Sequence, residues 1–204
     1  MRTFLAGLMA TIALPCSAAD ISIKGNTVFI AGTIDRGDYE VFLDKTKSID
    51  QPMTVVLHSR GGLLSEALRI GGLIRASGWY TKCEFVCFSA ASLIWLAGTK
   101  RFTTPNAQIG FHAPANTLTK ETDEVGIEIV KDYLTILGYG PEAAEYTMSA
   151  PHTGIRYLTV EDAKRVGITY TTVPVSIPRS QFTGRICRLI RLGSQSRCEA
   201  EPSQ

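Results

Sequence analysis

The sequence lacks an excess of either charge, since 21 basic and 19 acidic side chains leave a formal net charge of +2. Proteins that bind nucleic acid need a basic surface that neutralises phosphates, so a nearly neutral chain gives no indication of a nucleic-acid partner. Histidine is scarce, with 3 residues in 204, and the cysteines lack the spacing of a zinc or dithiol redox motif. We therefore expect no metal, nucleotide or other cofactor.

Long apolar runs are also missing, apart from one at the N-terminus that is too short to span a membrane. Arg2 precedes this run, which extends from Phe4 to Pro15, and small residues follow up to Ala19. A charged start, an apolar middle and small residues before a cut are typical of a secretory signal peptide. We expect a signal peptide over residues 1–19, with the cut after Ala19 or, as an alternative, after Ala18. The protein would then be exported, and either periplasmic or secreted.

Cysteine is uncommon, and four residues remain once the expected signal peptide is removed: Cys83, Cys87, Cys187 and Cys198. An even number of cysteines in an exported chain permits disulfides. Pairing each cysteine with its nearest neighbour in the chain predicts Cys83–Cys87 and Cys187–Cys198, although a sequence does not determine connectivity. The second pair would close the basic C-terminal tail at 178–204, which we expect to be solvated or loosely docked.

Short apolar runs alternate with amphipathic stretches between residues 20 and 177, which predicts one α/β domain with a mostly parallel sheet. Strands are expected at 20–33 (two short strands around a Gly-Asn turn), 53–57, 79–83, 100–104, 108–111 and 168–175. Helices are expected at 35–49, directly after Gly62, and at 87–98, 120–137, 141–149 and 159–167. In such folds, functional sites collect at the carboxyl ends of the strands.

Three features follow expected strands and therefore share one edge of the sheet: the turn Gly61-Gly62, Ser89 and His112. Ser89 begins a short apolar helix that ends at Gly98. A serine there either caps the helix or acts as a nucleophile whose developing oxyanion is held by the free N–H groups of the helix start. Gly61-Gly62 is either a tight turn or part of that oxyanion hole, and His112 is either a core histidine or a general base.

Four motifs occur in a fixed order along the chain. They are Ser-Arg-Gly-Gly after the strand at 55–57, the serine segment at 89–98, Lys-Arg-Phe-Thr-Thr-Pro-Asn at 100–106, and His-Ala-Pro at 112–114. Together they resemble the Clp protease proteolytic-subunit family within the Clp/crotonase superfamily. The resemblance covers about 53–173 and implies a spiral of β-β-α units. Because of the expected signal peptide, the chain resembles an exported, periplasmic branch of that family.

The resemblance implies that Ser89 is the nucleophile, with Ser92 as a competing candidate, and that His112 is the base. It places the oxyanion donors at the backbone N–H groups of Gly61 and Ala90. The implied function is an exported, ATP-independent serine peptidase that acts on peptides or proteins without a cofactor and forms a homo-oligomer, either a trimer or a ring. One alternative is a catalytically silent relative that binds peptide or a partner protein. Another is an acyl-CoA enzyme of the crotonase type, which export away from the cytosolic CoA pool disfavours.

One residue departs from the family's pattern, because Ile155 occupies the place of the aspartate that completes the catalytic triad. An isoleucine can neither orient an imidazole nor stabilise its protonated form. The third member is therefore unknown, and the substitutes considered are Thr153, a backbone carbonyl and a carboxylate such as Asp123. Without a substitute, the resemblance implies a slow Ser–His dyad or a silent site.

Overall fold

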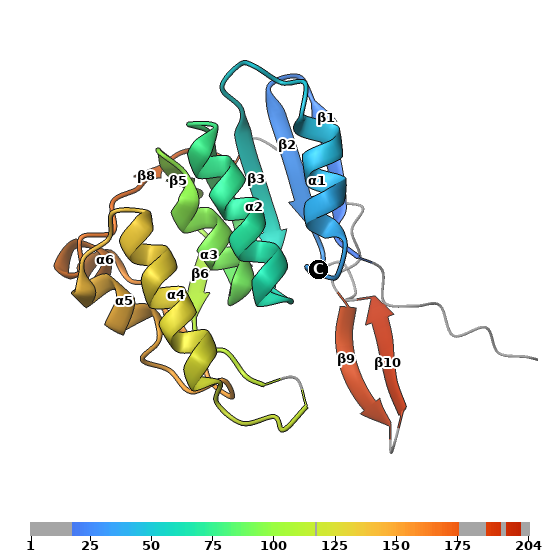
Figure 1. The fold of residues 1–204 in the computed structure, drawn as a ribbon, viewed down its shortest axis with the longest axis vertical. Coiled ribbons are helices and arrows are strands. Elements are labelled where there is room, and N and C mark those ends of the chain that lie inside the picture. Colours follow the sequence, from blue (N-terminus) through green and yellow to red (C-terminus); the bar gives the residue numbers. More distant parts are fainter. Residues whose placement is uncertain (1–17, 117, 176–186, 193–194, 201–204) are drawn as a thin grey trace, which may run out of the picture.

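One mixed β-sheet forms the centre of the protein, and helices pack against it (Figure 1). This computed structural model describes residues 18–116, 118–175, 187–192 and 195–200. Most of the expected signal peptide lies outside the described residues, as does the start of the C-terminal tail. Within the described residues, no helix is both long enough and apolar enough to cross a membrane.

The sheet contains eight strands. They are β1 (Asp20–Lys24), β2 (Thr27–Ala31), β3 (Thr54–Ser59), β4 (Tyr80–Phe88), β5 (Arg101–Thr103), β6 (Gln108–Phe111), β7 (Arg156–Tyr157) and β8 (Thr171–Thr172). Their order is β1-β2-β3-β4-β5-β8, while β6 pairs with the end of β4 and β7 pairs with β6. β1 and β7 are antiparallel to their neighbours, and the other pairings are parallel. The predicted α/β class with a mostly parallel sheet is confirmed.

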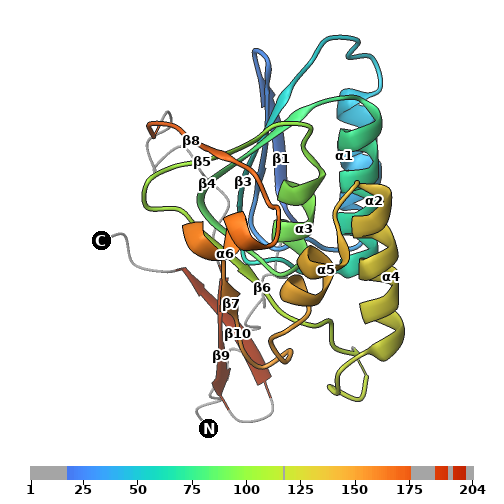
Figure 2. The same cartoon turned by 90° about the vertical axis from the view of Figure 1, so that its left-hand side faces the viewer.

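The helices of the described residues are α1 (Asp38–Thr46), α2 (Leu64–Ala76), α3 (Ala90–Ala97), α4 (Glu124–Ile136), α5 (Pro141–Thr147) and α6 (Val160–Arg165). Figure 2 shows α1, α2 and α4 on the same side of the sheet. All residues of α3 are buried, because this helix is apolar on every face and packs between α2 and β4. The predicted helices are confirmed, with ends that differ by a few residues.

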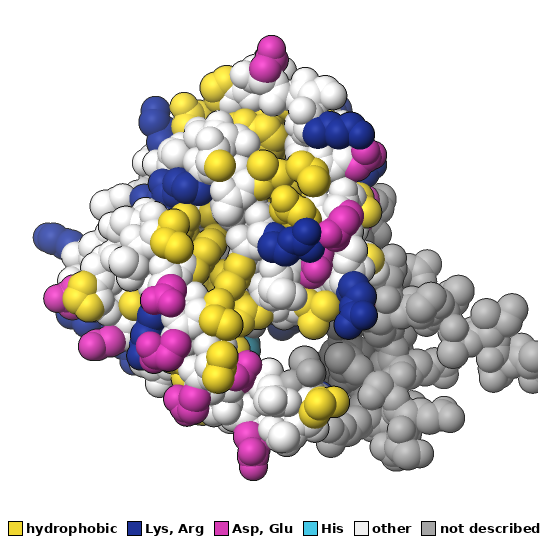
Figure 3. All heavy atoms as spheres, viewed as in Figure 1, with side chains coloured by type: hydrophobic (Ala, Val, Ile, Leu, Met, Phe, Trp, Pro, Cys, Tyr) yellow, Lys and Arg dark blue, Asp and Glu magenta, His cyan; other side chains and the backbone are white. Residues whose placement is uncertain are grey.

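The outer face of the helices keeps several apolar side chains exposed. Figure 3 shows apolar side chains gathered on the face of the molecule that these helices form. On α4, Val125 is 70% exposed and Ile136 is 81% exposed, and Ile129 lies between them. The opposite side of α4 packs into the core through Val130 and Leu134. α4 therefore has one apolar side in the core and another on the surface. An apolar side is unusual on a helix surface that contacts only water.

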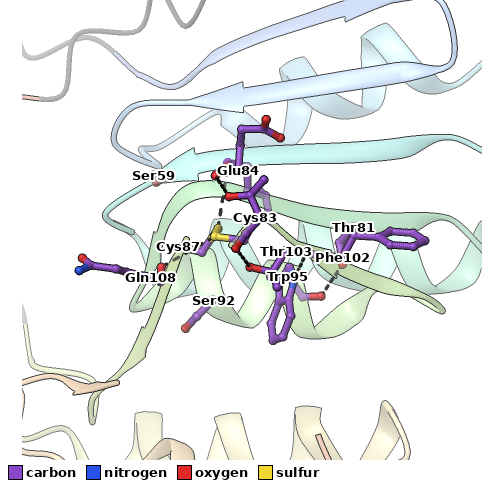
Figure 4. The surroundings of a disulfide bond; sticks show 12 residues. Ser59, Thr81, Cys83, Glu84, Cys87, Ser92, Trp95, Phe102, Thr103 and Gln108 are labelled. Carbon is purple, nitrogen blue, oxygen red and sulfur yellow. Dashed lines mark hydrogen bonds between the residues drawn. A yellow bond between two sulfur atoms is a disulfide. The ribbon is translucent and has the colours of Figure 1, made fainter. Parts of the chain in front are cut away.

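β4 is longer than predicted, because it continues past Cys83 to Phe88. Its register against β3 shifts, since Cys83 lies opposite Leu57 and Cys87 lies opposite Ser59. The extra residues form a bulge; before it β4 pairs with β5, and after it β4 pairs with β6. The structure joins Cys83 and Cys87 in a disulfide across this bulge, with their Cα atoms 5.9 Å apart (Figure 4). The bulge directs the end of β4 towards β6.

Two further strands, β9 (Cys187–Leu192) and β10 (Gln195–Ala200), form an antiparallel hairpin within the C-terminal tail. The sequence predicts no strand there, because arginines interrupt the apolar pattern that indicates one. The register places Cys187 and Cys198 on neighbouring strands, two positions out of line. A disulfide between these two cysteines stays a prediction.

Candidate active site

A cavity of about 470 Å³ brings the predicted strand-end features together. Gly62, Ser89, Ala90 and His112 line it, whereas Gly61, which the structure also describes, does not. The apolar part of the lining consists chiefly of Leu63, Leu64, Leu93, Phe111, Val130 and Met148. Cavities of roughly 300–1,000 Å³ with mostly apolar walls and a few polar groups are typical of ligand sites. Nowhere in the described residues do three or more His, Cys, Asp or Glu side chains gather to hold a metal ion.

Ser89 lies at the sharp turn between β4 and α3, with φ of 53° and ψ of −127°. Positive φ values are costly for residues other than glycine and, where they occur, cluster at functional sites. Backbone bonds hold the turn, since Ser89 N–H donates to Gly110 O at 2.9 Å and Ser92 N–H donates to Ser89 O at 3.0 Å. Although Ser89 occupies the N-cap position of α3, its side chain forms no capping hydrogen bond. The capping alternative is therefore wrong, and the half-buried hydroxyl is left for another role.

Ser92, the competing nucleophile, is fully buried and already uses its hydroxyl. Its Oγ donates to Ser89 O at 2.6 Å, so one carbonyl accepts from both the N–H and the O–H of Ser92. These two hydrogen bonds from Ser92 to the carbonyl oxygen of Ser89 stabilise the strained conformation of Ser89. Ser92 thus positions the turn, and Ser89 is the better candidate nucleophile of the two.

His112 directly follows β6 and is half-buried. Its Nδ1 lies 2.7 Å from the carbonyl oxygen of Ala113. When Nδ1 carries the proton and donates to this carbonyl, the lone pair of Nε2 is free to accept a proton, as a general base requires. Within the described residues, His112 and Ser89 share the cavity without a hydrogen bond between them. Catalytic hydrogen bonds of this kind often close only when substrate binds.

The carbonyl of Ala113 lies against the imidazole of His112 and can orient it. A backbone carbonyl is one of the three groups that could replace the missing aspartate. Asp123 also lines the cavity, but its Oδ1 accepts the N–H of Gly126 at 3.1 Å and so caps α4. Thr153 is exposed. A neutral carbonyl orients an imidazole, but it stabilises the protonated ring less than a carboxylate does. The site therefore brings Ser89 and His112 to one cavity, with a backbone carbonyl in contact with the imidazole in place of a carboxylate.

The two glycines of the turn at Gly61-Gly62 have different backbone surroundings. The N–H of Gly61 already donates to Ser59 Oγ at 3.0 Å. Ile34 forms a parallel bridge with Gly62, in which Ile34 N–H donates to Gly61 O and Leu63 N–H donates to Ile34 O. In this pattern the N–H of the middle residue points away from the partner strand, and Gly62 lines the cavity. Because the N–H of Gly61 donates to Ser59, Gly62 is a better candidate than the predicted Gly61 for the oxyanion donor, and this role stays a prediction.

Gly61 packs directly on the Ser89 turn. A Cβ at this position would lie 2.8 Å from both Phe88 O and Ser89 Cβ, and 3.0 Å from Ala90 N. The φ of 100° at Gly61 also belongs to a region that side chains rarely adopt. The glycine thus allows the turn to approach the start of α3, and Gly62 and Ala90 both line the cavity together with Ser89.

Comparison with solved structures assigns this architecture to the Clp/crotonase-like class of α/β folds. A mutant of ClpP1 from Listeria monocytogenes is similar, with a TM-score of 0.56 at 22% sequence identity, over 78% of this chain and 95% of that chain. The ClpP protease catalytic domain from Plasmodium falciparum has a TM-score of 0.57 at 21% identity, over 77% of this chain and 90% of that chain. At these identities the likeness shows the fold.

Sequence comparison then narrows the class to a family. The sequence model of the Clp protease family matches residues 22–136, which is more than half of the chain. The chain belongs to the Clp protease family. No curated protein sequence matches it. The resemblance on which the expected nucleophile and base rest is thereby confirmed at the level of the family, and the expected export stays a prediction.

Proposed function

We propose that the protein is an exported serine peptidase in which Ser89 is the nucleophile and His112 the general base, while Gly62 and Ala90 bind the oxyanion. The observation that carries this proposal is the conformation of Ser89. It combines a positive φ at the end of β4 with a hydroxyl that caps nothing, in a cavity shared with His112 and Gly62. Membership of the Clp protease family supports it.

The proposed reaction begins when Ser89 Oγ attacks the carbonyl carbon of a peptide bond and His112 Nε2 takes the hydroxyl proton. The N–H groups of Gly62 and Ala90 donate to the oxygen that becomes negative. The C–N bond then breaks, and His112 returns the proton to the leaving amine. Water hydrolyses the acyl-enzyme by the same steps, with His112 again as the base, and Ser89 regains its proton.

The cavity supports a peptide substrate with an apolar side chain beside the bond that is cleaved. Leu93, Phe111 and Val130 supply apolar walls close to Ser89 in the same cavity. Leu63, next to the proposed oxyanion donor, has an extended backbone with φ of −67° and ψ of 121°. A peptide would lie beside this segment as an added strand, with main-chain hydrogen bonds for affinity and the apolar walls for selectivity.

The experiment that tests this proposal is labelling of the purified protein with a fluorophosphonate probe, which reacts with activated serines. We expect the wild type to be labelled, and we expect Ser89→Ala and His112→Ala to lose labelling. Ser65→Ala is the matched control, because Ser65 is another serine of the cavity lining that lies outside the proposed machinery. Labelling that persists in Ser89→Ala, or a folded wild type that is never labelled, would reject the peptidase proposal.

A second candidate function is a catalytically silent member of the family that binds peptide or a partner protein. Ile155 in the place of the expected aspartate favours it. In that case the apolar cavity and its extended edge still bind a peptide, but no bond is cleaved. Calorimetric binding of a peptide with an apolar side chain, without turnover over a day, would support this alternative. Absence of both binding and turnover would reject it.

The proposal includes a homo-oligomer, either a trimer or a ring. The exposed Val125, Ile129 and Ile136 on α4 support it, because contact with another copy would remove these side chains from water. Light scattering of the purified protein tests this part. A monomer at micromolar concentration would contradict the oligomer. The proposed chemistry at Ser89 is tested separately, by fluorophosphonate labelling.

A further inference from the structure

Asp38, the first residue of α1, is a buried carboxylate in an acidic environment. Its side chain is 1% exposed, and its Oδ2 accepts Asp35 N–H at 2.7 Å and Ala19 N–H at 3.1 Å. Burial raises the pKa of Asp38, and the carboxylates of Asp35 and Glu66 also raise it, while the two N–H donors lower it. In the part of the chain that the structure describes, no Lys, Arg or His side chain pairs with Asp38.

Arg69, a basic side chain of this region, already binds other groups. Arg69 contacts Glu40 at 2.8 Å and Glu66 at 3.8 Å, and it stacks on Tyr39 at 3.8 Å from the ring centre. A buried carboxylate is costly unless a positive charge accompanies it. A cation at Asp38 must therefore come from a group other than these side chains.

The backbone nitrogen of Ala19 is the group that can supply this charge. It contacts Asp38 directly, and Ala18 and Ala19 are the small residues that end the expected signal peptide. Hydrolysis of the bond between them adds one water, so that Ala18 gains a carboxylate and Ala19 gains a protonated α-amine. Ala18 is exposed, whereas Ala19 is half-buried and packs against the core. The nitrogen that would become charged is therefore already in place.

We propose that a signal peptidase cleaves the Ala18–Ala19 bond, and that the new α-ammonium group of Ala19 forms a buried ion pair with Asp38. Cys16 and Ala18 are then the small residues before the cut. The other candidate cut, after Ala19, removes the nitrogen that contacts Asp38 and starts the chain at Asp20. The structure thus selects between two cuts that the sequence leaves nearly equal, and it makes processing the source of the missing positive charge.

The same ion pair lies next to the segment that holds the proposed oxyanion hole. Asp38 binds the N–H of Asp35, and the preceding residue, Ile34, forms the bridge with Gly62. Ile34 N–H donates to Gly61 O at 2.9 Å. Fixing Asp38 therefore also fixes the strand segment on which the Gly61-Gly62 turn rests, and processing would order the site.

A double-mutant cycle on thermal stability tests the ion pair. Chains that begin at Ala18, Ala19 or Asp20 are produced from fusions whose removal leaves these N-termini, each with the natural Asp38 and with Asp38→Asn. We expect the natural chain that begins at Ala19 to have the highest Tm, by about 3–8 °C, since only its ammonium group reaches Asp38. In the Asp38→Asn background we expect the three Tm values to agree. Equal Tm values for the three natural chains would overturn the proposal.

The N-terminus of the exported protein gives an independent test. Mass spectrometry of the protein recovered after export is expected to find a chain that begins at Ala19, and a chain that begins at Asp20 would overturn the proposed cut. In the chain that begins at Ala19, we expect the α-amine to react more slowly with an acylating reagent than the α-amine of the chain that begins at Ala18. Equal reactivity of the two amines would overturn burial of the pair.

The proposed effect of the ion pair on the oxyanion hole rests on the proposed function. It is measured by labelling of Ser89, separately from the Tm cycle and from the analysis of the N-terminus. We expect fluorophosphonate to label Ser89 faster in the chain that begins at Ala19 than in the chain that begins at Ala18. Equal labelling rates in the two chains would overturn the link to the oxyanion hole. Absence of labelling in all chains would reject the proposed function, while the Tm cycle would still decide the ion pair between Ala19 and Asp38.

Discussion

The side chain of Ile155 lies against Gly110, on the strand that leads to His112. Its Cγ2 is 2.6 Å from the position that a Cβ on Gly110 would take. The antiparallel register of β6 and β7 ends with Phe111 opposite Arg156. Continued by one step, this register places Ile155 opposite His112. At the position where the family's aspartate would face the proposed general base, this chain therefore has an apolar side chain.

Restoring an acid at this position is the first prediction. We expect Ile155→Asp to raise kcat for a fluorogenic peptide by about tenfold or more, because a carboxylate stabilises protonated His112 better than the Ala113 carbonyl does. Ile155→Asn is the matched control, since it supplies a polar group of the same size without the charge. Equal gains in the two variants would contradict a charge effect and indicate orientation alone.

The acceptor of the Gly61 N–H is the second target. We expect Ser59→Ala to lower kcat about tenfold with little change in KM, because the turn that presents Gly62 loses the bond that fixes it. Thr46→Val is the control, since Thr46 is also a buried hydroxyl and donates to Phe42 O at 2.7 Å on α1. Each variant is expected to lose about 1–3 kcal/mol of stability. A similar fall of kcat in both would contradict a positioning role for Ser59.

The disulfide across the β4 bulge leads to a third prediction. Replacing both Cys83 and Cys87 by alanine is expected to lower the free energy of unfolding by about 2 kcal/mol, the chain-entropy value for so short a loop. For a domain of this size that corresponds to a Tm lower by about 4–8 °C. Urea unfolding and calorimetry measure the change. Mass spectrometry after alkylation of the denatured, unreduced protein is the control, and alkylated Cys83 or Cys87 would contradict the pairing.

Asp162 on α6 leads to a prediction about acid stability. Arg165 donates to its Oδ1 at 2.7 Å, and this bond lowers the pKa of Asp162 below its ordinary value of 3.8. Hydrogen bonding to Tyr146 and the charge of Arg156 lower it further. A carboxyl group whose pKa is lowered by folding stabilises the fold above its ordinary pKa, and this contribution disappears as the pH falls through the lowered value.

We therefore expect the Tm difference between the wild type and Asp162→Asn to be largest near neutral pH and to disappear as the pH falls through the lowered pKa of Asp162. Calorimetric scans at several pH values measure this difference. Scans in high salt serve as the control, because screening weakens the attraction of the two arginines and reduces the difference at neutral pH. A difference that stays constant from neutral to acidic pH would show that Asp162 acts through packing instead of charge.

Much of the fold could be predicted from the sequence, because it depends on residues that are close in the chain. The apolar, β-branched run from Val55 to Leu57 predicts a strand buried on both faces, and β3 contains it. Gly61-Gly62 predicts a turn between strand and helix, and the apolar segment after Ser89 predicts a buried helix. Periodicity and backbone preference are local properties, so the order of elements follows from them.

Other elements exist only because a distant partner lies beside them. β7 contains two residues and is a strand because it pairs with β6, so no local sequence pattern predicts it. The end of β4 was missed because Glu84 interrupts its apolar run, and the bulge that absorbs this interruption is defined by the register against β3. Both features determine where the proposed nucleophile and base stand, and neither has a signal of its own.

The residue types at the strand ends can be read from the sequence, whereas the contacts between their atoms depend on how distant segments pack. Gly61 and Gly62 are chemically identical, yet the N–H of Gly61 donates to Ser59, whereas Gly62 forms the bridge with Ile34 and lines the cavity. Ala19 and Asp38 lie 19 positions apart, and their contact forms when the helix packs beside the first strand. The physical reason is that register and packing follow from burying many side chains at once, so contacts between distant groups have no local pattern.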